Sequence, residues 1–342
     1  MIVRARAPLR LGLAGGGTDV SPFCDLHGGY VMNVTIDRHA YATVDPSPTG
    51  LAEFHALDAG ISELLAPSEV DLGQGPLQLM KGVYRRITRQ FLDGRAPALR
   101  VRSHSDAPPG SGLGSSSTMV VALVTAFVEY FGLALGEYDI AHLAYEIERV
   151  DLALAGGKQD QYAAAFGGFN FIEFYADDRV IVNPLRVKPW IWAELEASLV
   201  LYFTGVSRAS ATIIDEQSRN IREGRGDSLD AMHRLKLEAT QMKEALLLGD
   251  FPRLATVMQA GWEAKKQSAS CITNPAIDKI EALASANGAR ATKVSGAGGG
   301  GFMMFLCDPA ERIPLVRAMS GAGGTVFDTH FTADGARSWR IG

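Results

Sequence analysis

The chain has 342 residues, of which 47% are hydrophobic and 21% are charged. This is ordinary globular composition, and it excludes a disordered chain. The length suggests about two domains of roughly 150 residues each. The formal net charge of −5 argues against nucleic acid as the main partner, because no basic excess would meet a phosphate backbone.

Targeting and redox signals are nearly absent from the sequence. Residues 1–6 lack the apolar stretch of a secretory signal, and no run approaches the ~20 apolar residues of a membrane-spanning helix. The three cysteines lie far apart without CxxC spacing, which favours neither a disulfide framework nor a zinc site. We therefore expect a cytoplasmic protein without a membrane partner.

Short runs of β-branched and apolar residues, bounded by glycine or proline, predict the strands of the first half. They cover residues 2–12, 30–44, 98–104 and 167–174. Apolar residues at three- and four-residue spacing predict helices. These cover residues 77–91, 119–131 and 137–155, the second of them almost wholly apolar and therefore buried. The pattern loosens near residues 184–192, where we place a boundary between domains 1–190 and 191–342.

The second half mixes strands and helices without the regular alternation of a doubly wound sheet. Strands are expected at 198–206, 291–295, 302–307 and 325–331. Several helices are expected between residues 209 and 286, and another near 309–319. Both halves together predict an α+β protein of two domains.

A loop of glycines and serines, Pro108–Thr118 (PPGSGLGSSST), separates a predicted strand from the buried helix. Its alternate glycines remove Cβ atoms, and backbone N–H groups at a helix start attract anions with the positive end of the dipole. Serine hydroxyls add donors or one hard oxygen ligand for Mg²⁺. A flexible turn capped by serine is the alternative interpretation. The loop predicts a polyphosphate site, although it is not a Walker A motif.

This loop resembles the phosphate-binding motif of the GHMP kinase superfamily, which includes galactokinase, homoserine kinase, mevalonate kinase and phosphomevalonate kinase. Two more segments resemble family motifs in the same order: Pro8–Asp19 (PLRLGLAGGGTD), the N-terminal substrate motif, and Lys293–Gly301 (KVSGAGGGG), the C-terminal glycine motif. The resemblance implies an N-terminal domain like ribosomal protein S5 domain 2 and a ferredoxin-like C-terminal domain. It also implies an active site between them that uses ATP and Mg²⁺.

The resemblance assigns roles to single residues. In the loop it implies that phosphate is bound by Pro109, Gly110, Ser111, Gly112, Leu113, Gly114, Ser115, Ser116 and Ser117. Ser116 resembles the serine that contacts Mg²⁺, with Ser115 and Ser117 as close competitors. Gly156–Gln161 (GGKQDQ) resembles the segment with the catalytic aspartate, which makes Asp160 the expected residue. Its alternative role is to cap the next helix. Lys158 is a further catalytic candidate, and a solvated lysine is an equally good interpretation of it.

On the acceptor side, Arg10 and Asp19 resemble the sugar-kinase residues that steady the transferred group and bind a sugar hydroxyl. A turn carboxylate that bonds its own backbone is the alternative interpretation of Asp19. The further expected substrate contacts are Gly16, Gly17, Thr18, Gly298 and Gly299. Galactokinases carry an acidic residue and a histidine where this chain has Gly16 and Gly17, which argues against galactose and suggests a differently shaped pocket.

Three further segments, Gln159–Gly168, Tyr202–Ser210 and Trp262–Lys266, resemble the bacterial heptose 7-phosphate kinases within the superfamily. This likeness implies phosphorylation of the anomeric hydroxyl of D-glycero-D-manno-heptose 7-phosphate, on the route to nucleotide-activated heptose and surface polysaccharide. A sugar-phosphate substrate requires cationic partners. The candidates are Arg208, which belongs to the expected substrate site, and the neighbouring Lys265 and Lys266.

Three alternatives stay open from the sequence. A sugar 1-kinase of fucose or mannose type shares every motif and differs only in its acceptor contacts. A mevalonate-pathway type of GHMP enzyme is the second alternative. The third is a ligand-binding member without catalysis, against which the intact Ser116 and Asp160 argue. The sequence is also compatible with a homodimer.

Overall fold

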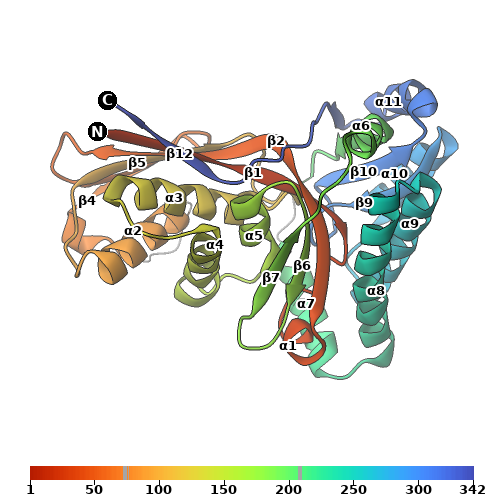
Figure 1. The fold of residues 1–342 in the computed structure, drawn as a ribbon, viewed down its shortest axis with the longest axis horizontal. Coiled ribbons are helices and arrows are strands. Elements are labelled where there is room, and N and C mark those ends of the chain that lie inside the picture. Colours follow the sequence, from red (N-terminus) through yellow and green to blue (C-terminus); the bar gives the residue numbers. More distant parts are fainter. Residues whose placement is uncertain (72–74, 76, 207–209) are drawn as a thin grey trace.

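The computed structural model describes residues 1–71, 75, 77–206 and 210–342. Their strands form two sheets, and the two chain ends lie side by side on the larger one (Figure 1). The strands are β1 (Ile2–Ala14), β2 (Gly29–Pro46), β3 (Ala52–Ala56), β4 (Ile61–Leu65), β5 (Leu99–Ser105), β6 (Phe169–Phe174), β7 (Val180–Pro184), β8 (Leu199–Phe203), β9 (Ala289–Val294), β10 (Phe302–Cys307), β11 (Thr325–Phe327) and β12 (Arg337–Ile341).

The helices precede, connect and cover these strands. They are α1 (Phe23–His27), α2 (Gln78–Phe91), α3 (Ser115–Phe131), α4 (Glu137–Glu146), α5 (Gln159–Phe166), α6 (Pro189–Ser198), α7 (Ser210–Arg222), α8 (Gly226–Leu248), α9 (Phe251–Ser268), α10 (Pro275–Ala286) and α11 (Arg312–Ser320). One π-helical turn, η2 (Ile147–Asp151), continues α4, and short 3₁₀ turns occur at Pro67–Glu69 and Pro309–Glu311.

The larger sheet has the strand order β12-β1-β2-β5-β3-β4, with β6 and β7 added beside β2. Helices α2 to α5 lie against one face of it (Figure 1). The beginning of β1 alternates between buried residues such as Val3 and outward ones such as Arg4, as expected for a sheet with one solvated face. From Ala7 to Ala14 every residue of β1 is buried, so this part of the strand is covered on both faces.

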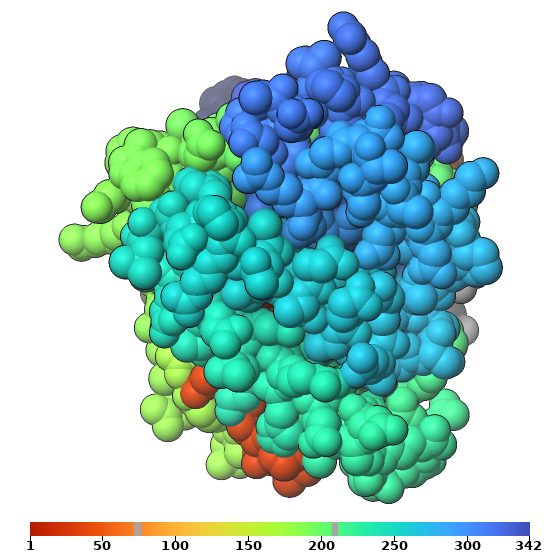
Figure 2. All heavy atoms as spheres, turned by 90° about the vertical axis from the view of Figure 1, so that its right-hand side faces the viewer, coloured from red at the N-terminus to blue at the C-terminus, as the bar shows by residue number. Residues whose placement is uncertain are grey.

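The second cover comes from the C-terminal half. Leu9 and Leu11 of β1 share a hydrophobic core with α8 residues such as Met242 and with β8 and β10 of the second sheet. Helices α8 and α9 run side by side along this end of the molecule (Figure 1), and the helices of residues 210–290 form most of the face seen in Figure 2. The two halves of the chain therefore meet across a shared apolar core.

The second sheet is antiparallel, with the order β11-β8-β10-β9. Numbered along the chain, these strands stand in the order 4-1-3-2, and helices connect the first to the second and the third to the fourth. That arrangement is the split βαβ topology of ferredoxin-like domains. The predicted α+β class and the ferredoxin-like C-terminal half are thus confirmed.

Most predicted elements are present with shifted ends, and a few short ones were not predicted. The unpredicted elements are β3, β4, β7, β12, α1 and α6, and α5 was expected only as a helix after Asp160, without bounds. The helix predicted over 137–155 ends at Asp151, because its last turn opens into the π-helical η2. The division into 1–190 and 191–342 stays a proposal, since α6 spans it and β12 returns to the first sheet.

None of the helices that the structure describes is both long enough and apolar enough to cross a lipid bilayer.

Candidate active site

A cavity of about 400 Å³ lies where the two halves meet. Its walls come from the end of β1, the starts of α3 and α5, helices α7 and α9, and the loop before β10. Residues from all three glycine-rich motifs line it, and so do two residues outside them, Asp160 and Lys265. The motif residues include Arg10, Gly17, Asp19, Gly110, Gly112, Gly114, Ser115, Ser116, Ser117 and Gly296. The motifs are far apart in the sequence, so the fold itself assembles this site.

The loop before α3 shows why its glycines alternate. Gly110, Gly112 and Gly114 line the cavity, whereas Ser111 and Leu113 between them are buried. The three glycines have φ values of 71°, 84° and 76°, which other residues rarely adopt. Helix α3 then starts at Ser115, and the first N–H groups of a helix have no partner inside it. The loop before α3 and the first turn of that helix therefore offer backbone N–H donors of the kind that bind anions.

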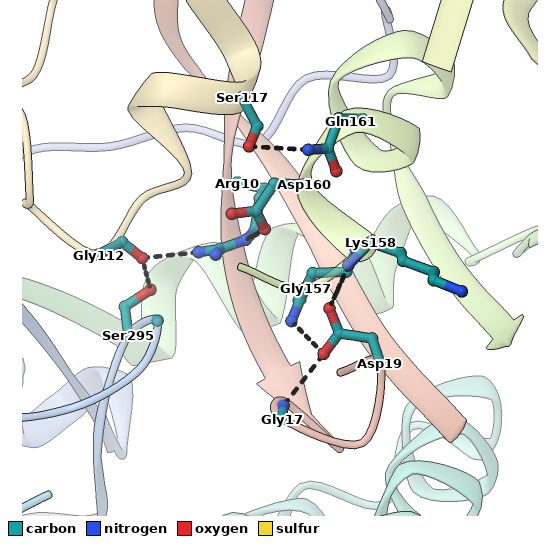
Figure 3. Close-up of polar contacts among 12 residues, drawn as sticks. Arg10, Gly17, Asp19, Gly112, Ser117, Gly157, Lys158, Asp160, Gln161 and Ser295 are labelled. Atoms are coloured by element: carbon teal, nitrogen blue, oxygen red, sulfur yellow. Dashed lines mark hydrogen bonds and ion pairs between the residues drawn. The ribbon is translucent and has the colours of Figure 1, made fainter. Parts of the chain in front are cut away.

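Arg10 and Asp160 form the central ion pair of the cavity. Nε of Arg10 donates to Oδ1 of Asp160 at 2.7 Å, and Nη1 donates to the carbonyl oxygen of Gly112 at 2.6 Å (Figure 3). The same carbonyl accepts a hydrogen bond of 2.9 Å from Oγ of Ser295. Arg10 is 4% exposed and the Asp160 side chain 22%, so the carboxylate opens onto the cavity. One guanidinium therefore connects β1, the loop before α3 and the start of α5.

Asp19 occupies the start of α5 from a distant part of the chain. Its Oδ2 accepts the backbone N–H groups of Lys158 and Gln159 at 3.0 Å each. Its Oδ1 accepts from the Gln159 side chain at 3.0 Å and from the N–H of Gly17 at 3.1 Å. A Cβ on Gly157 would stand 2.0 Å from Oδ2, so only glycine admits this approach. Asp19 lines the cavity and at the same time orients the helix that carries Asp160.

One serine of the run contacts a buried carboxylate that the sequence did not single out, and a second is linked to it through Gln161. Oγ of Ser116 donates to Oε1 of Glu148 at 3.0 Å. Nε2 of Gln161 donates to Oε2 of Glu148 at 2.6 Å and to Oγ of Ser117 at 3.1 Å. Glu148 is 1% exposed and lies in the cavity wall. Its sequence signal is its position four residues after the buried Ala144, where a helix face is otherwise apolar.

The predicted Lys158 does not reach the cavity. Its side chain extends away from the Arg10–Asp160 pair (Figure 3), and Nζ pairs with Asp178 at 2.6 Å and lies 3.7 Å from Asp25. Burial alone would lower the pKa of Lys158, but the hydrogen bond to Asp178 and the nearby Cys24 and Tyr145 outweigh it and raise the pKa. Sequence spacing cannot show that this side chain, at the start of α5, points away from the cavity.

Several other expected residues support the walls rather than face the cavity. The Thr18 hydroxyl donates to the carbonyl oxygens of Gly15 and Tyr30. Gly299 donates its N–H to Ile272, and a Cβ on Gly298 would touch the same residue. The cavity is lined by Gly296 and Ala297 of that loop instead. Arg208 lies outside the described residues.

Comparisons with known proteins place this site in a family. The family models for the N-terminal and the C-terminal domain of GHMP kinases match residues 78–168 and 242–319. The D-glycero-alpha-D-manno-heptose 7-phosphate kinase of Campylobacter jejuni is 46% identical over 339 residues, which are 99% of each chain. The chain belongs to the GHMP kinases. As a member of this family it is a phosphotransferase, and the predicted resemblance is confirmed.

Solved structures and more distant relatives agree with this family. A crystal structure named D-glycero-D-manno-heptose 1-phosphate kinase, from Bacteroides thetaiotaomicron, is 44% identical to this GHMP kinase. It matches with a TM-score of 0.84 over 99% of each chain. The L-fucokinase/L-fucose-1-P guanylyltransferase of Bacteroides fragilis is 25% identical over 93% of this chain and 36% of its own.

The contact between the phosphate loop and the C-terminal loop yields a testable prediction at Gly112. A Cβ at this position would stand 2.5 Å from the carbonyl oxygen of Ser295, and the positive φ adds strain. We expect Gly112→Ala to lower kcat/KM for ATP by at least about tenfold, because it displaces the carbonyl that holds Arg10. Steady-state kinetics with ATP varied measures this. The matched control is Gly226→Ala, whose Cβ meets no neighbour, and equal effects of both variants would contradict the prediction.

Proposed function

We propose that this GHMP kinase transfers the γ-phosphoryl group of ATP to the anomeric hydroxyl of D-glycero-D-manno-heptose 7-phosphate in the cytoplasm. The Arg10–Asp160 pair carries the catalytic part of the proposal, because it places a carboxylate beside an anion cradle. The acceptor rests on the 46% identity, over nearly the full length, to the heptose 7-phosphate kinase of Campylobacter jejuni. The product would be the 1,7-bisphosphate, a precursor of nucleotide-activated heptose for surface polysaccharide.

The nucleotide side of the cavity fits a triphosphate. The cavity-facing glycines of the loop leave room for phosphate oxygens beside the start of α3, where backbone donors and the helix dipole favour negative charge. We assign phosphate binding to the loop residues 109–117, with Ser111 and Leu113 acting as buried anchors. Arg149 contributes a cation at the same wall, held by the carbonyl oxygens of Gly157 and Leu154.

Ser116 and Glu148 are suited to hold Mg²⁺ together. Their side-chain oxygens are 3.0 Å apart in the cavity wall, and Mg²⁺ prefers one or two protein oxygens together with phosphate oxygens and water. Such a site therefore needs no cage made of protein ligands alone. When bound, the ion would neutralise charge on the phosphates. Ser116 is the better candidate among the three serines because it alone donates to Glu148.

Asp160 is the residue that we assign to the acceptor hydroxyl. Its carboxylate faces the cavity and is held at Oδ1 by Arg10, which leaves Oδ2 to orient the hydroxyl and accept its proton. Arg10 keeps a positive charge next to the transferred phosphoryl group, where negative charge is spread over three oxygens. Asp19 is assigned to a sugar hydroxyl and to the placement of α5. Lys158 is not part of this proposal, because its side chain points elsewhere.

The two heptose kinases among the relatives carry different names, one for a 7-phosphate and one for a 1-phosphate. The position of the phosphate on the acceptor is therefore part of the test. Gly17 lines the cavity, and neither Gly16 nor Gly17 has a side chain that would take up space beside it, which suits a seven-carbon sugar phosphate better than the side chains of galactokinases would.

The proposal is tested by ADP release with Mg-ATP across a panel of acceptors. The panel holds heptose 7-phosphate, heptose 1-phosphate, fucose, mannose, galactose and mevalonate. We expect heptose 7-phosphate to be turned over best, and Asp160→Asn to lower kcat by about 10²–10⁴-fold. The matched control is Asp93→Asn, a 91% exposed aspartate, which should behave as wild type. Preferred turnover of another acceptor would refute the proposed substrate. An active Asp160→Asn enzyme would refute the proposed role of Asp160.

A second prediction concerns the metal. Glu148→Gln keeps the size of the side chain but removes its charge, so we expect the Mg²⁺ concentration for half-maximal rate to rise about 10–100-fold. A titration of activity with Mg²⁺ at saturating ATP measures the shift. Glu146→Gln is the control, since Glu146 ends α4 directly before the turn that carries Glu148 but pairs with Arg86 outside the cavity. An unchanged Mg²⁺ requirement in Glu148→Gln would remove Glu148 from the metal site.

A further inference from the structure

Two adjacent lysines of α9 have opposite surroundings. Lys266 pairs with Glu263 at 2.7 Å, lies 3.6 Å from Glu281 and stands over the Trp262 ring. Lys265 is 2% exposed and lies in the wall of the active-site cavity. The sequence offered both as candidates for an anionic acceptor group, and the structure directs only Lys265 toward the site.

The Lys265 ammonium has fewer partners than its burial demands. Its Nζ donates to the carbonyl oxygen of Gly296, and within the described residues this is its one hydrogen bond, without a carboxylate in ion-pair contact. An ammonium carries three N–H donors, and a buried charge is costly unless its donors are satisfied. The two remaining donors thus call for oxygen atoms from a molecule in the cavity.

The position of Nζ shows which part of that molecule it meets. A Cβ on Gly16 would stand 3.8 Å from Nζ of Lys265 and 3.8 Å from Nε2 of Gln159, the amide that holds Asp19. On the other side, Gly296 follows Ser295, which bonds the same Gly112 carbonyl as Arg10. Nζ therefore lies between the substrate turn and the C-terminal glycine loop, close to the Arg10–Asp160 pair.

We propose that Lys265 is a catalytic acceptor-binding residue, whose ammonium donates hydrogen bonds to the oxygens at the reacting end of the sugar. This inference rests on the proposed function. In the transfer, the acceptor oxygen bonds to the γ-phosphorus, the bond from phosphorus to the β–γ bridging oxygen breaks, and the hydroxyl proton passes to Asp160. Lys265 keeps its protons and offsets the charge that develops on the acceptor oxygen.

The charged groups around Lys265 support this role. Burial and, to a smaller extent, the neighbouring Arg10 lower the pKa of Lys265, Asp19 and Asp160 act in the opposite direction, and the net result is a pKa of about 8. Burial and the neighbouring Lys265 likewise lower the pKa of Lys293 to about 7, against the effect of Glu238. An ammonium with a pKa near 8 loses its proton as the pH rises past that value, so the acceptor-binding form is present below about pH 8.

The test compares Lys265→Met and Lys265→Gln with wild type and with the control Lys266→Met. For heptose 7-phosphate we expect kcat/KM to fall at least about 100-fold in both Lys265 variants, with the KM for ATP unchanged. The wild-type kcat/KM should decline above about pH 8, and this decline should be absent from both variants. Lys266→Met should match wild type throughout. Thermal melting should show both Lys265 variants folded, since neither retains the buried charge.

Near-wild-type kcat/KM in folded Lys265 variants would overturn the proposal, and so would an alkaline decline that persists in them. A fall of equal size in Lys266→Met would do the same, because the effect would then belong to the helix and not to the cavity. The failure of the proposed function is a separate result. If wild type prefers another acceptor of the panel, the same variants are measured on that acceptor. The Lys265 proposal then predicts the same fall in kcat/KM for both Lys265 variants.

Discussion

The hydrogen bonds of one buried guanidinium organise the active site. Arg10 reaches from β1 to the Asp160 carboxylate and to the carbonyl oxygen of Gly112, and that carbonyl also receives Ser295 from the C-terminal loop. Removing any of these partners would leave a buried charge or a buried polar group unpaired, which is far more costly than a lost surface contact. One side chain therefore holds both the Asp160 carboxylate and the loop before α3, and the C-terminal loop meets it at the same carbonyl oxygen.

The fold explains how these groups can come from such distant parts of the chain. The first half of β1 has a solvated face, whereas its second half is covered on both faces, on one of them by the core that the two halves of the chain share. The strand ends in this covered region, so the turn that follows it lies where the two halves of the chain meet. Asp19 of that turn then accepts the N–H groups that begin α5, so the turn and the helix that carries Asp160 are joined directly.

The sequence predicts the parts of this site that consist of backbone, and it predicts single side chains less well. The alternate glycines before α3, the α+β class and the ferredoxin-like half follow from glycine spacing, strand pattern and family motifs. Glu148 was missed, because a glutamate inside a predicted amphipathic helix gives little sign that it faces a serine 32 residues earlier. Lys158 was expected at the site, but its side chain points away from the cavity, because neighbouring residues at the start of a helix point to different sides of it. Lys265 and Lys266 are equivalent in sequence and separable only by burial. β12 is short and exposed, and it is stabilised mainly by pairing with β1 at the other end of the chain.

The most direct test of the account is the position of the new phosphate in the product. The wild-type enzyme would be incubated with Mg-ATP and heptose 7-phosphate, and the product examined by ³¹P and ¹H nuclear magnetic resonance. The account predicts a second phosphorus signal coupled to the anomeric proton, formed in equal amount with ADP. A phosphate on any other carbon, or ADP formed without a phosphorylated sugar, would contradict the assignment of the Arg10–Asp160 pair to the anomeric hydroxyl.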